Sequence, residues 1–600
     1  MDLRLLVLAA FVVAAVAAIA DGPVVKRSDV VFMGSKSADI YQAYGATMVS
    51  WGGHASSDDP KAIEDFKKRV QVAHDLGMRY CAGLAFRTAF AAMIDFDEGF
   101  MDSVCRTLDG EPVLVPWLWD HKHKGHPAYW FCTNAPGYRE YLKHQTRLAM
   151  AADVEGLHID DYNGTAGTEW RGGCFCPHCM AAFRRHLADS VSPERLKQCG
   201  VESLDGFDYG EFLRGRGVTT EDYRRRVEGD LPLGPEFLTF QYQAAAAWVH
   251  EIHQYAEGLV GHPLILSVNS SASSPKSLVI APQLTYFCGE VPRQADSRRA
   301  PTDCLFVYKL GDALRRPIVS TSSGQDWAFT DEHKKPGLVR LWIAQAYACG
   351  HQLMAPHRQW AYTETKGTHW YQSEPSDYAP LYQFVRAHAD LLDDYEAVAQ
   401  VGLVYSNAAF RANKRATRDA CLALAAANVP FRLLVMGDDW LTVPPPAADD
   451  LAPLKAVVCT EPLMLDEAQT ALLDTVKDRL VTWPDEGRLF SLVPRQVALD
   501  GAEDIAILPR AVPGAADRPF VCHLVNQNYD PEADAPVKQT GFRLTLASSL
   551  FGGARIAAAT LYAPEREPVE LTLSHKPDAV ELLVPELDLW AVVKLVPERG

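Results

Sequence analysis

The sequence predicts an α/β protein: a (β/α)8 TIM barrel, a small flavodoxin-like α/β domain and a C-terminal antiparallel β-sandwich. Short apolar runs alternate with amphipathic stretches over residues 30–356. The same alternation resumes near residue 401, and a two-residue alternation replaces it from about residue 519. We therefore divide the chain into a signal peptide (1–20), a catalytic barrel domain (21–397), an α/β domain (398–500) and a sandwich domain (501–600).

Seven barrel strands are predicted from buried apolar runs, and they lie at 33 with 47–50, 79–84, 156–160, 264–269, 284–288, 317–321 and 351–355. An eighth strand is expected near 112–118. The intervening helices are expected at 60–76, 137–152, 235–258 and 337–348. Eight parallel strands favour a closed barrel, whose chemistry is found at the carboxyl ends of the strands.

The second block is predicted to contain strands at 401–405, 431–435 and 456–459, with helices at 417–427 and 466–477. It has no glycine-rich phosphate loop, so nucleotide binding is not indicated. Strands of the final block are expected at 520–525, 542–546 and 591–595, where apolar and polar residues alternate.

Composition and the N-terminus indicate an exported globular protein. The formal net charge of −18, from 58 basic and 76 acidic residues, disfavours nucleic acid and anionic membranes as partners. Arg4 precedes an apolar run over 5–17, and Ala18-Ile19-Ala20 offers small residues for cleavage. The run is short for a membrane span. We expect a cleaved signal peptide, a secreted or periplasmic location and no membrane attachment after cleavage.

Three of the 13 cysteines, Cys174, Cys176 and Cys179, lie within six residues, whereas nine others are scattered singly and are expected to be buried thiols. Thiolates at this spacing can converge on one zinc ion. A closed structural site needs a fourth ligand, and Cys132 or His178 could supply it. The alternative is a set of free or disulfide-paired thiols.

The segment 132–139 (Cys-Thr-Asn-Ala-Pro-Gly-Tyr-Arg), the run 157–161 and the cysteines leading into Ala182-Phe183 resemble the glycoside hydrolase family 42 β-galactosidases. The resemblance is specific in the cysteine segment and architectural beyond about Tyr395. It implies that Cys132, Cys174, Cys176 and Cys179 bind a structural zinc ion. It also implies the barrel, an α/β domain that helps to form trimers, and a small β domain.

The sequence departs from this family at both catalytic glutamates. The family's general acid follows an Ile-Asp-Asn stretch, and Tyr162 takes its place here. The family's nucleophile ends strand seven, and the matching run 320–327 has no glutamate. The resemblance therefore transfers the scaffold but neither catalytic carboxylate.

Cleavage of a glycosidic bond needs a proton donor and a second carboxylate. Asp160 and Asp161 end strand four, and Glu290 follows strand six, as in barrels of the α-galactosidase and α-fucosidase type. We expect Asp160 or Asp161 to be the nucleophile and Glu290 the acid/base. Adjacent strand residues point oppositely, so one aspartate is expected to be structural, bonded to backbone or to His158. Glu290 could instead pair with Arg293. Glu169 and Asp326 are reserve candidates.

Aromatic and polar side chains that follow the predicted strands are expected to bind substrate, because flat rings stack on sugars and polar groups bond hydroxyls. They are Trp51, His54, Arg87, Trp119, His121, Tyr162, Asn163, Asn269, Gln325, Trp327, His357, Arg358 and Trp360. His121 and His123 could alternatively bind a metal.

Three functions fit this pattern. The first is a secreted, retaining glycosidase that cleaves O-glycosidic bonds of a plant, algal or host glycan. The second is a non-catalytic carbohydrate-binding barrel, which the missing family glutamates suggest. The third is a zinc-dependent hydrolase, which an all-cysteine site disfavours because it leaves no open position for water.

Overall fold

The computed structural model of the chain describes residues 25–515 and 517–598. The predicted signal peptide, residues 1–20, lies outside the described residues. Within them, no helix combines the length and apolarity that a bilayer crossing requires.

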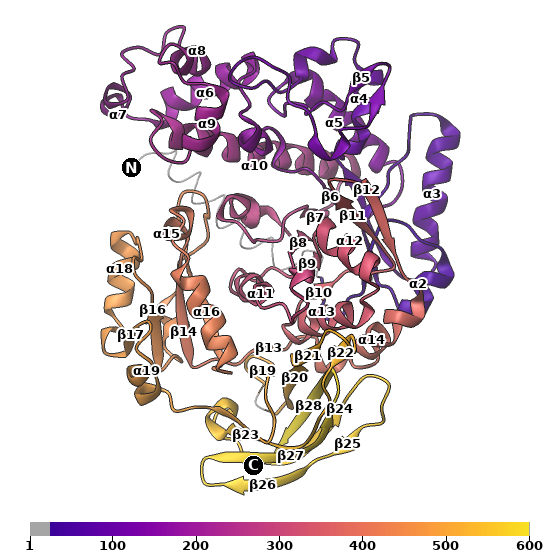
Figure 1. Cartoon of the computed structure of the whole chain (residues 1–600), viewed down its shortest axis with the longest axis vertical. Helices are drawn as coiled ribbons and strands as arrows, with labels where there is room; N and C mark the ends of the chain where they lie inside the picture. The colour runs from indigo at the N-terminus through magenta and orange to yellow at the C-terminus, as the bar shows by residue number, and fades with distance from the viewer. Residues whose placement is uncertain (1–24, 516, 599–600) are drawn as a thin grey trace.

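Eight parallel strands form the centre of the N-terminal half of the chain (Figure 1). They are β1 (Val31–Met33), β2 (Met48–Gly52), β3 (Arg79–Leu84), β6 (Gly156–Ile159), β7 (Ile265–Val268), β8 (Phe287–Glu290), β9 (Ile318–Thr321) and β10 (Gln352–Leu353). The first five form one sheet in the order β1-β2-β3-β6-β7, and the others form a second in the order β10-β9-β8. Seven of the eight predicted strands are therefore present.

The two sheets are linked at both junctions by isolated contacts. Among the described residues, neither junction has a continuous ladder of hydrogen bonds. Between β7 and β8, Asn269 bridges to Cys288 and the Thr285 N–H donates to the Leu266 carbonyl at 2.9 Å. Between β10 and β1, the Ala355 N–H donates to the Val31 carbonyl at 2.8 Å. The architecture is α/β, with eight strands whose carboxyl ends lie at one edge.

The prediction of a strand near residues 112–118 was wrong. The missing strand is β1, which is only three residues long and pairs in register with β2. Residues 112–118 instead form isolated bridges, such as Leu114 to Tyr129, and end in the 3-10 turn η3 (Pro116–Leu118). Proline lacks an N–H group, so Pro112 and Pro116 disfavour a central strand.

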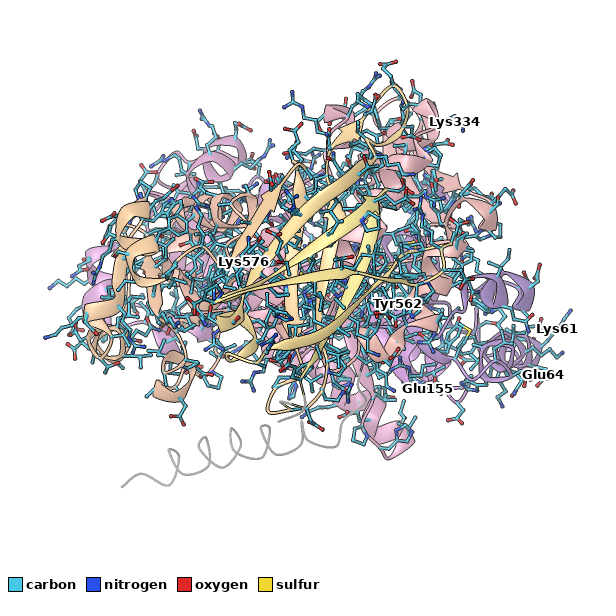
Figure 2. All side chains as sticks on the ribbon, turned by 90° about the horizontal axis from the view of Figure 1, so that it is seen from below. Lys61, Glu64, Glu155, Lys334, Tyr562 and Lys576 are labelled. Atoms are coloured by element: carbon cyan, nitrogen blue, oxygen red, sulfur yellow. The ribbon has the colours of Figure 1, made fainter. Side chains whose placement is uncertain are left out.

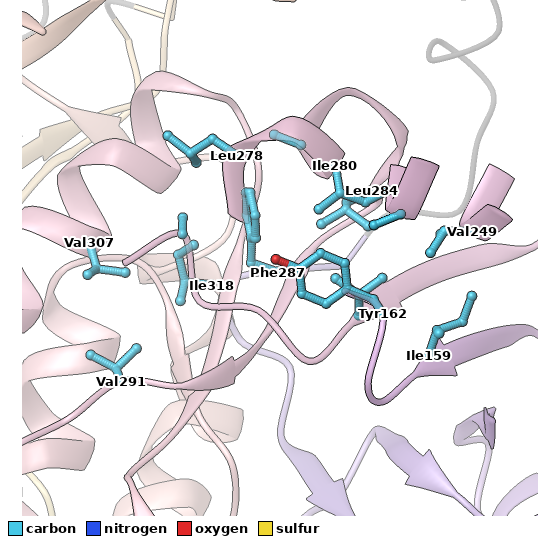
Figure 3. Close-up of a cluster of buried hydrophobic side chains, with 14 of the residues drawn as sticks. Ile159, Tyr162, Val249, Leu278, Ile280, Leu284, Phe287, Val291, Val307 and Ile318 are labelled. Atoms are coloured by element: carbon cyan, nitrogen blue, oxygen red, sulfur yellow. The ribbon is translucent and has the colours of Figure 1, made fainter. Parts of the chain in front are cut away.

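Helices surround the strands, and the four predicted ones are confirmed as α3 (Pro60–His74), α5 (Pro136–Ala149), α10 (Gly234–Val260) and α13 (Pro336–Ala348). Others that bear on the site are α2 (Ala38–Tyr44), η4 (Gly164–Arg171), α6 (Pro177–Ser190), η5 (Pro275–Gln283), α11 (Cys304–Ala313), α12 (Gly324–His333) and α14 (Pro375–Ala387). Buried aliphatic and aromatic side chains fill the space between strands and helices, as around Phe287, Leu284 and Ile318 (Figure 3).

A second, four-stranded parallel sheet follows, in the order β15-β14-β16-β17. Its strands are β14 (Val401–Ser406), β15 (Phe431–Met436), β16 (Ala456–Cys459) and β17 (Leu480–Thr482). The helices α15 (Asn407–Arg411), α16 (Ala416–Ala426), α18 (Glu467–Asp474) and α19 (Glu486–Leu492) accompany it. The three strands and two helices predicted for this block are confirmed.

Two antiparallel sheets that share an apolar core form the C-terminal part. One has the order β13-β19-β20-β28-β24-β25 and the other β18-β23-β27-β26. Their longer strands are β19 (Ile505–Ala511), β20 (Phe520–Asn526), β23 (Gln539–Ala547), β24 (Ile556–Tyr562), β27 (Ala579–Leu587) and β28 (Trp590–Pro597). The short strands β13 (Glu396–Ala397) and β18 (Val497–Asp500) also join these sheets, although both precede residue 501.

The C-terminal sheets pack against the amino-terminal end of the parallel strands. Arg510 Nε donates to the Ala348 carbonyl at 3.2 Å, and the Trp590 ring stacks on Tyr347. Figure 2 shows these sheets from below, with Tyr562 and Lys576 labelled on them. The C-terminal part also contacts the start of α13, where the Gly337 N–H donates to Asp534 Oδ2 at 2.8 Å.

Candidate active site

Three acidic residues lie at the carboxyl ends of β6 and β8. Asp160 and Asp161 follow β6 directly, and Glu290 is the last residue of β8. All three are half-buried. Burial raises the pKa of Glu290 to about 8, and the charges of Asp160 and Asp161 add to the shift. The acids predicted from the sequence therefore influence one another electrostatically.

Asp160 is held through one of its two carboxylate oxygens. Its Oδ1 accepts from Trp51 Nε1 at 3.2 Å and from Asn269 Nδ2 at 2.9 Å. Burial and the neighbouring Asp161 raise the pKa of Asp160 to about 7, while these two hydrogen bonds oppose the shift. The arrangement fixes the carboxylate and leaves Oδ2 without a protein donor among the described residues.

Asp161 is engaged differently, by a cation. Its Oδ2 lies 3.4 Å from Arg87 Nε, and the side chains are only 17% and 3% exposed, respectively. The Arg87 guanidinium is also sandwiched against the Trp130 ring, 4.5 Å from its centroid. Burial raises the pKa of Asp161, and Arg87 counteracts it. Of the two adjacent aspartates, only Asp161 is paired with a cation.

The expected alternative of a bond to His158 is wrong for both aspartates. His158 Nδ1 instead bonds Ser267 Oγ at 2.9 Å, and the Trp51 ring lies 4.1 Å from its ring centroid. Trp51 itself has a φ of 51°. This left-handed backbone conformation is uncommon for a large side chain and here turns the indole toward Asp160.

The Glu290 carboxylate has no hydrogen bond or ion pair with any described residue. The suggested pairing with Arg293 is therefore wrong, because Arg293 NH2 bonds the Tyr308 hydroxyl at 2.7 Å and Ser320 Oγ at 3.0 Å. The main chain of Glu290 is fixed, since its carbonyl accepts from Ser271 Oγ at 2.6 Å. A half-buried carboxyl without a partner and with a raised pKa can hold a proton at neutral pH.

The reserve acids are both occupied elsewhere. Asp326 is buried and caps α12, where its carboxylate accepts from Ser322 Oγ, Ser323 Oγ and the Ala295 N–H. Glu169 accepts from Lys276 Nζ at 2.5 Å and from the Tyr242 hydroxyl. Each of these carboxylates therefore accepts hydrogen bonds from other residues, whereas the Glu290 carboxylate accepts none from the described residues.

Among the predicted substrate-binding residues, Tyr162 and Trp327 lie in the core. Tyr162 is 6% exposed and lies among Ile159, Leu284 and Phe287 (Figure 3). Trp327 is fully buried, and its Nε1 donates to Thr321 Oγ1 at 2.9 Å. Neither ring is available for stacking on a sugar, because each fills space between a strand and a helix.

Trp51, Arg87 and Asn269 contact the aspartates directly, as described above. The other predicted side chains are exposed or half-buried but do not contact the acids, and they are His54, Trp119, His121, Asn163, Gln325, His357, Arg358 and Trp360. His121 and His123 bond to Asp120 and Asp95, respectively, so the two imidazoles do not converge on one ion.

Lys36 was missed in the sequence analysis. It follows β1, and its Nζ donates to the Met33 carbonyl at 2.6 Å. Burial and the charge of Arg358 lower the pKa of Lys36 to about 8. Because Val31–Met33 was merged with the next strand, this lysine was not seen as a residue at a strand end.

Four buried cysteines form a second cluster close to the acids. The Sγ atoms of Cys132, Cys174, Cys176 and Cys179 all lie within 4.8 Å of one another. Cys132 Sγ is 3.5 Å from the Sγ atoms of both Cys176 and Cys179. Four thiolates about 2.3 Å from a zinc ion would be separated by roughly 3.8 Å, so the set fits a tetrahedral metal site.

Donors around the cysteines suit thiolates. Thr165 Oγ1 and the Asn134 N–H each lie 3.3 Å from Cys132 Sγ, and Asn134 Nδ2 lies 3.3 Å from Cys179 Sγ. His178 is not in the cluster, because its Nε2 bonds Asp102 at 2.8 Å on the surface. Of the two candidate fourth ligands, only Cys132 is in place. The structure has no disulfide bond among the 13 cysteines.

No family model matches the chain. It is 27% identical over 598 residues to an α-agarase of Thalassotalea agarivorans and 24% identical over 582 residues to an α-agarase of Alteromonas agarilytica. These alignments cover 95% and 92% of this chain but 40% of each relative. The chain thus spans about two fifths of the length of the curated relatives it matches.

Two solved structures share the fold. An α-L-fucosidase of Paenibacillus thiaminolyticus matches with a TM-score of 0.61 at 10% identity, over 96% of this chain and 100% of that one. A β-galactosidase of Rahnella sp. R3 matches with a TM-score of 0.52 at 13% identity, over 93% and 98%, respectively. Both structural matches show a shared fold.

Proposed function

We propose that the chain is a secreted, retaining glycoside hydrolase that uses Asp160 as nucleophile and Glu290 as acid/base. The observation that carries the proposal is the contrast between them. Asp160 is fixed by two donors to one oxygen, whereas Glu290 is unpartnered and has the higher pKa. Paired carboxyls whose environments differ in this way are typical of acid and base roles.

In the proposed first step, Glu290 donates its proton to the glycosidic oxygen as the bond to the anomeric carbon breaks. Asp160 Oδ2 attacks that carbon, so a glycosyl ester forms and the shortened glycan leaves with the proton. The Glu290 carboxylate then removes a proton from water, whose oxygen attacks the anomeric carbon. The ester bond breaks, Asp160 regains its charge, and Glu290 is protonated again.

Arg87 and Trp51 position the nucleophile. The Arg87 guanidinium offsets the charge of Asp161, which would otherwise oppose ionisation of Asp160. Trp51 Nε1 and Asn269 Nδ2 bond Asp160 Oδ1 and stabilise the carboxylate form. These contacts favour an ionised Asp160 next to a protonated Glu290.

Agar is the proposed substrate, because both curated relatives are α-agarases. The proposed scaffold is a (β/α)8 barrel closed at its two junctions, followed by a flavodoxin-like α/β domain and a β-sandwich. Its relation to the family 42 β-galactosidases is supported by the cysteine segment and by the Rahnella fold match. The trimer implied by that resemblance remains part of this proposal.

A structural zinc ion is proposed at Cys132, Cys174, Cys176 and Cys179. Bound there, zinc would join the segment before α5 to the start of α6 without an open coordination position for water. Thr165, which bonds Cys132 Sγ, belongs to η4, the turn that follows Asp161. The cysteine site would therefore hold the loop that carries the aspartates.

The test is hydrolysis of agarose and of aryl α-galactosides, measured as reducing ends and released phenol. Proton NMR of the first product reports the anomeric configuration, and retention is expected. Asp160→Asn and Glu290→Gln should each lower agarose cleavage by at least about 100-fold, whereas the surface variant Glu332→Gln on α12 should not. Binding of agarose without cleavage by the wild type would replace the hydrolase with a carbohydrate-binding barrel.

A further inference from the structure

A β-hairpin that follows β10 has two chemically different faces. It consists of β11 (Arg358–Thr363) and β12 (Gly367–Gln372), with Trp360 directly opposite Trp370 and Tyr362 opposite Thr368. Side chains alternate across a strand, so one face carries Arg358, Trp360, Tyr362, Thr368, Trp370 and Gln372. The other face carries Gln359, Ala361 and Tyr371, which are all buried.

The buried face attaches the hairpin next to the proposed acid/base. Gln359 Oε1 accepts from Thr321 Oγ1 at 2.8 Å, and Gln359 Nε2 donates to the Ala355 carbonyl at 3.0 Å. Thr321 is the register partner of Glu290 on the neighbouring strand. The Tyr371 and Tyr378 hydroxyls bond at 2.6 Å, which ties the second strand to α14. Figure 1 shows the hairpin beside α12.

The outer face carries three aromatic rings, of which Trp370 is exposed and Trp360 and Tyr362 are half-buried. Trp370 is 47% exposed, and the Arg358 guanidinium lies 4.1 Å from the centroid of its ring. The Trp360 and Tyr362 rings are stacked, 5.9 Å apart and 15° from parallel. Thr368 Oγ1 accepts from Trp360 Nε1 at 3.3 Å, so the ladder is held as one surface.

A second loop extends this aromatic surface. Trp119, in the loop after η3, is 62% exposed, and a Cβ placed on Gly367 would lie 3.9 Å from its Nε1. Thr368 Oγ1 also donates to the Trp117 carbonyl at 3.4 Å. Of the 13 tryptophans, only Trp119, Trp170 and Trp370 are exposed. The Trp119 indole therefore lies at the turn of the hairpin that carries Trp370, on a loop that follows a different strand.

We propose that the rings of Trp119, Trp360, Tyr362 and Trp370 form a distal subsite that binds sugar units of the glycan beyond the scissile bond. Indole faces stack on the apolar faces of pyranose rings, while Arg358, Thr368 and Gln372 can bond the hydroxyls at their edges. The continuity with Glu290 through Thr321 and Gln359 argues for the same glycan chain as occupant. The inference rests on the proposed function and makes the substrate a polymer several units long.

The experiment compares Trp370→Ala with Trp370→Phe and with Leu583→Ala, a control on β27 whose side chain is 45% exposed. Retention in agarose affinity gels is measured in a Glu290→Gln background, so the binding assay needs no turnover. In the active background, kcat/KM is measured for agarose and for a short aryl glycoside. Circular dichroism and thermal melting check that each variant is folded.

Trp370→Ala is expected to weaken agarose retention about tenfold and to lower kcat/KM for agarose at least five times more than for the aryl glycoside. Trp370→Phe should retain most of the binding, because a ring remains. Equal retention of Trp370→Ala and the parent, or equal loss for both substrates, would overturn the subsite. Concentration-dependent association of the wild type that Trp370→Ala abolishes, with agarose retention unchanged, would instead make this face an interface between copies. Retention without any cleavage would refute the hydrolase while leaving the glycan subsite intact.

Discussion

Replacement of Glu290 by glutamine should make the protein more stable at alkaline pH while it removes activity. The native carboxyl has a pKa of about 8, raised from 4.5 by burial and by the charges of Asp160 and Asp161. Between these two values the native state binds more protons than the unfolded chain, so stability falls as pH rises from about 4.5 to 8. Glutamine cannot ionise and should remove this part of the decline.

The magnitude follows from the shift. About 3.5 pKa units at about 1.4 kcal/mol each set an upper limit of roughly 5 kcal/mol above pH 8. Partial exposure of the carboxyl to water reduces this, and we expect about 2–3 kcal/mol. At about 2 °C per kcal/mol, Glu290→Gln should melt roughly 5 °C above the wild type at pH 9. At pH 4.5 the two melting temperatures should agree.

Differential scanning fluorimetry from pH 4.5 to 9 measures the effect, with Glu332→Gln as an exposed control. Activity supplies a second readout, because general acid catalysis contributes about 10²–10⁴-fold. Agarose cleavage should fall by that range in Glu290→Gln, and a substrate whose phenol leaves without protonation should lose much less. A pH-independent difference in melting temperature between Glu290→Gln and wild type would refute the reasoning, since it would mean that the carboxyl has the same pKa in the native and unfolded states.

Three further outcomes are expected. The pH profile of kcat/KM should be bell-shaped, with limbs near pH 7 and 8 as Asp160 ionises and Glu290 loses its proton. Asp160→Asn should lower kcat at least 10³-fold in stopped assays, and circular dichroism should show that this variant is still folded. Arg87→Met should destabilise the fold by about 3–5 kcal/mol in urea unfolding, because it leaves the Asp161 carboxylate unpaired. Adding Asp161→Asn should recover part of this loss, and no recovery would mean that the two residues are not coupled. Elemental analysis should find one zinc ion per chain in the wild type and none in Cys179→Ser. Chelation should lower the melting temperature, while the protein that stays folded keeps its turnover. Loss of turnover without loss of folding would assign the metal to the chemistry.

The sequence allowed seven of the eight parallel strands to be located, because each is a buried run of at least two apolar residues beside a strand-ending polar group. The exception has a physical reason. β1 has three residues, so its periodicity cannot be separated from that of the next strand. Lys36, which follows β1, was therefore not recognised as a residue at a strand end. The segment 112–118 is apolar enough for a strand, but Pro112 and Pro116 lack the N–H groups that a ladder needs.

Spacing along a strand could place Asp160, Asp161 and Glu290 at one edge, but it could not separate their environments. The difference comes from Arg87, which follows β3, from Trp51, which lies in β2, and from Asn269, which follows β7. Tyr162 illustrates the reverse error. It lies one residue beyond the acids, yet the chain turns there and buries the ring, because the Tyr162 N–H bonds the Asp160 carbonyl at 2.7 Å.

The same turn explains how the site can differ from the family it resembles and keep the scaffold. The turn after β6 directs the residue at the family's glutamate position into the core, where a carboxyl would be desolvated without a partner. Tyrosine fits there because most of its surface is apolar. The acid must then come from another strand, and Glu290 at the end of β8 has both the exposure and the unpaired oxygens. Under the proposed mechanism the proton donor therefore lies on β8 and not on β6, because the backbone of β8 leaves the Glu290 carboxyl half-buried and without a hydrogen-bond partner among the described residues.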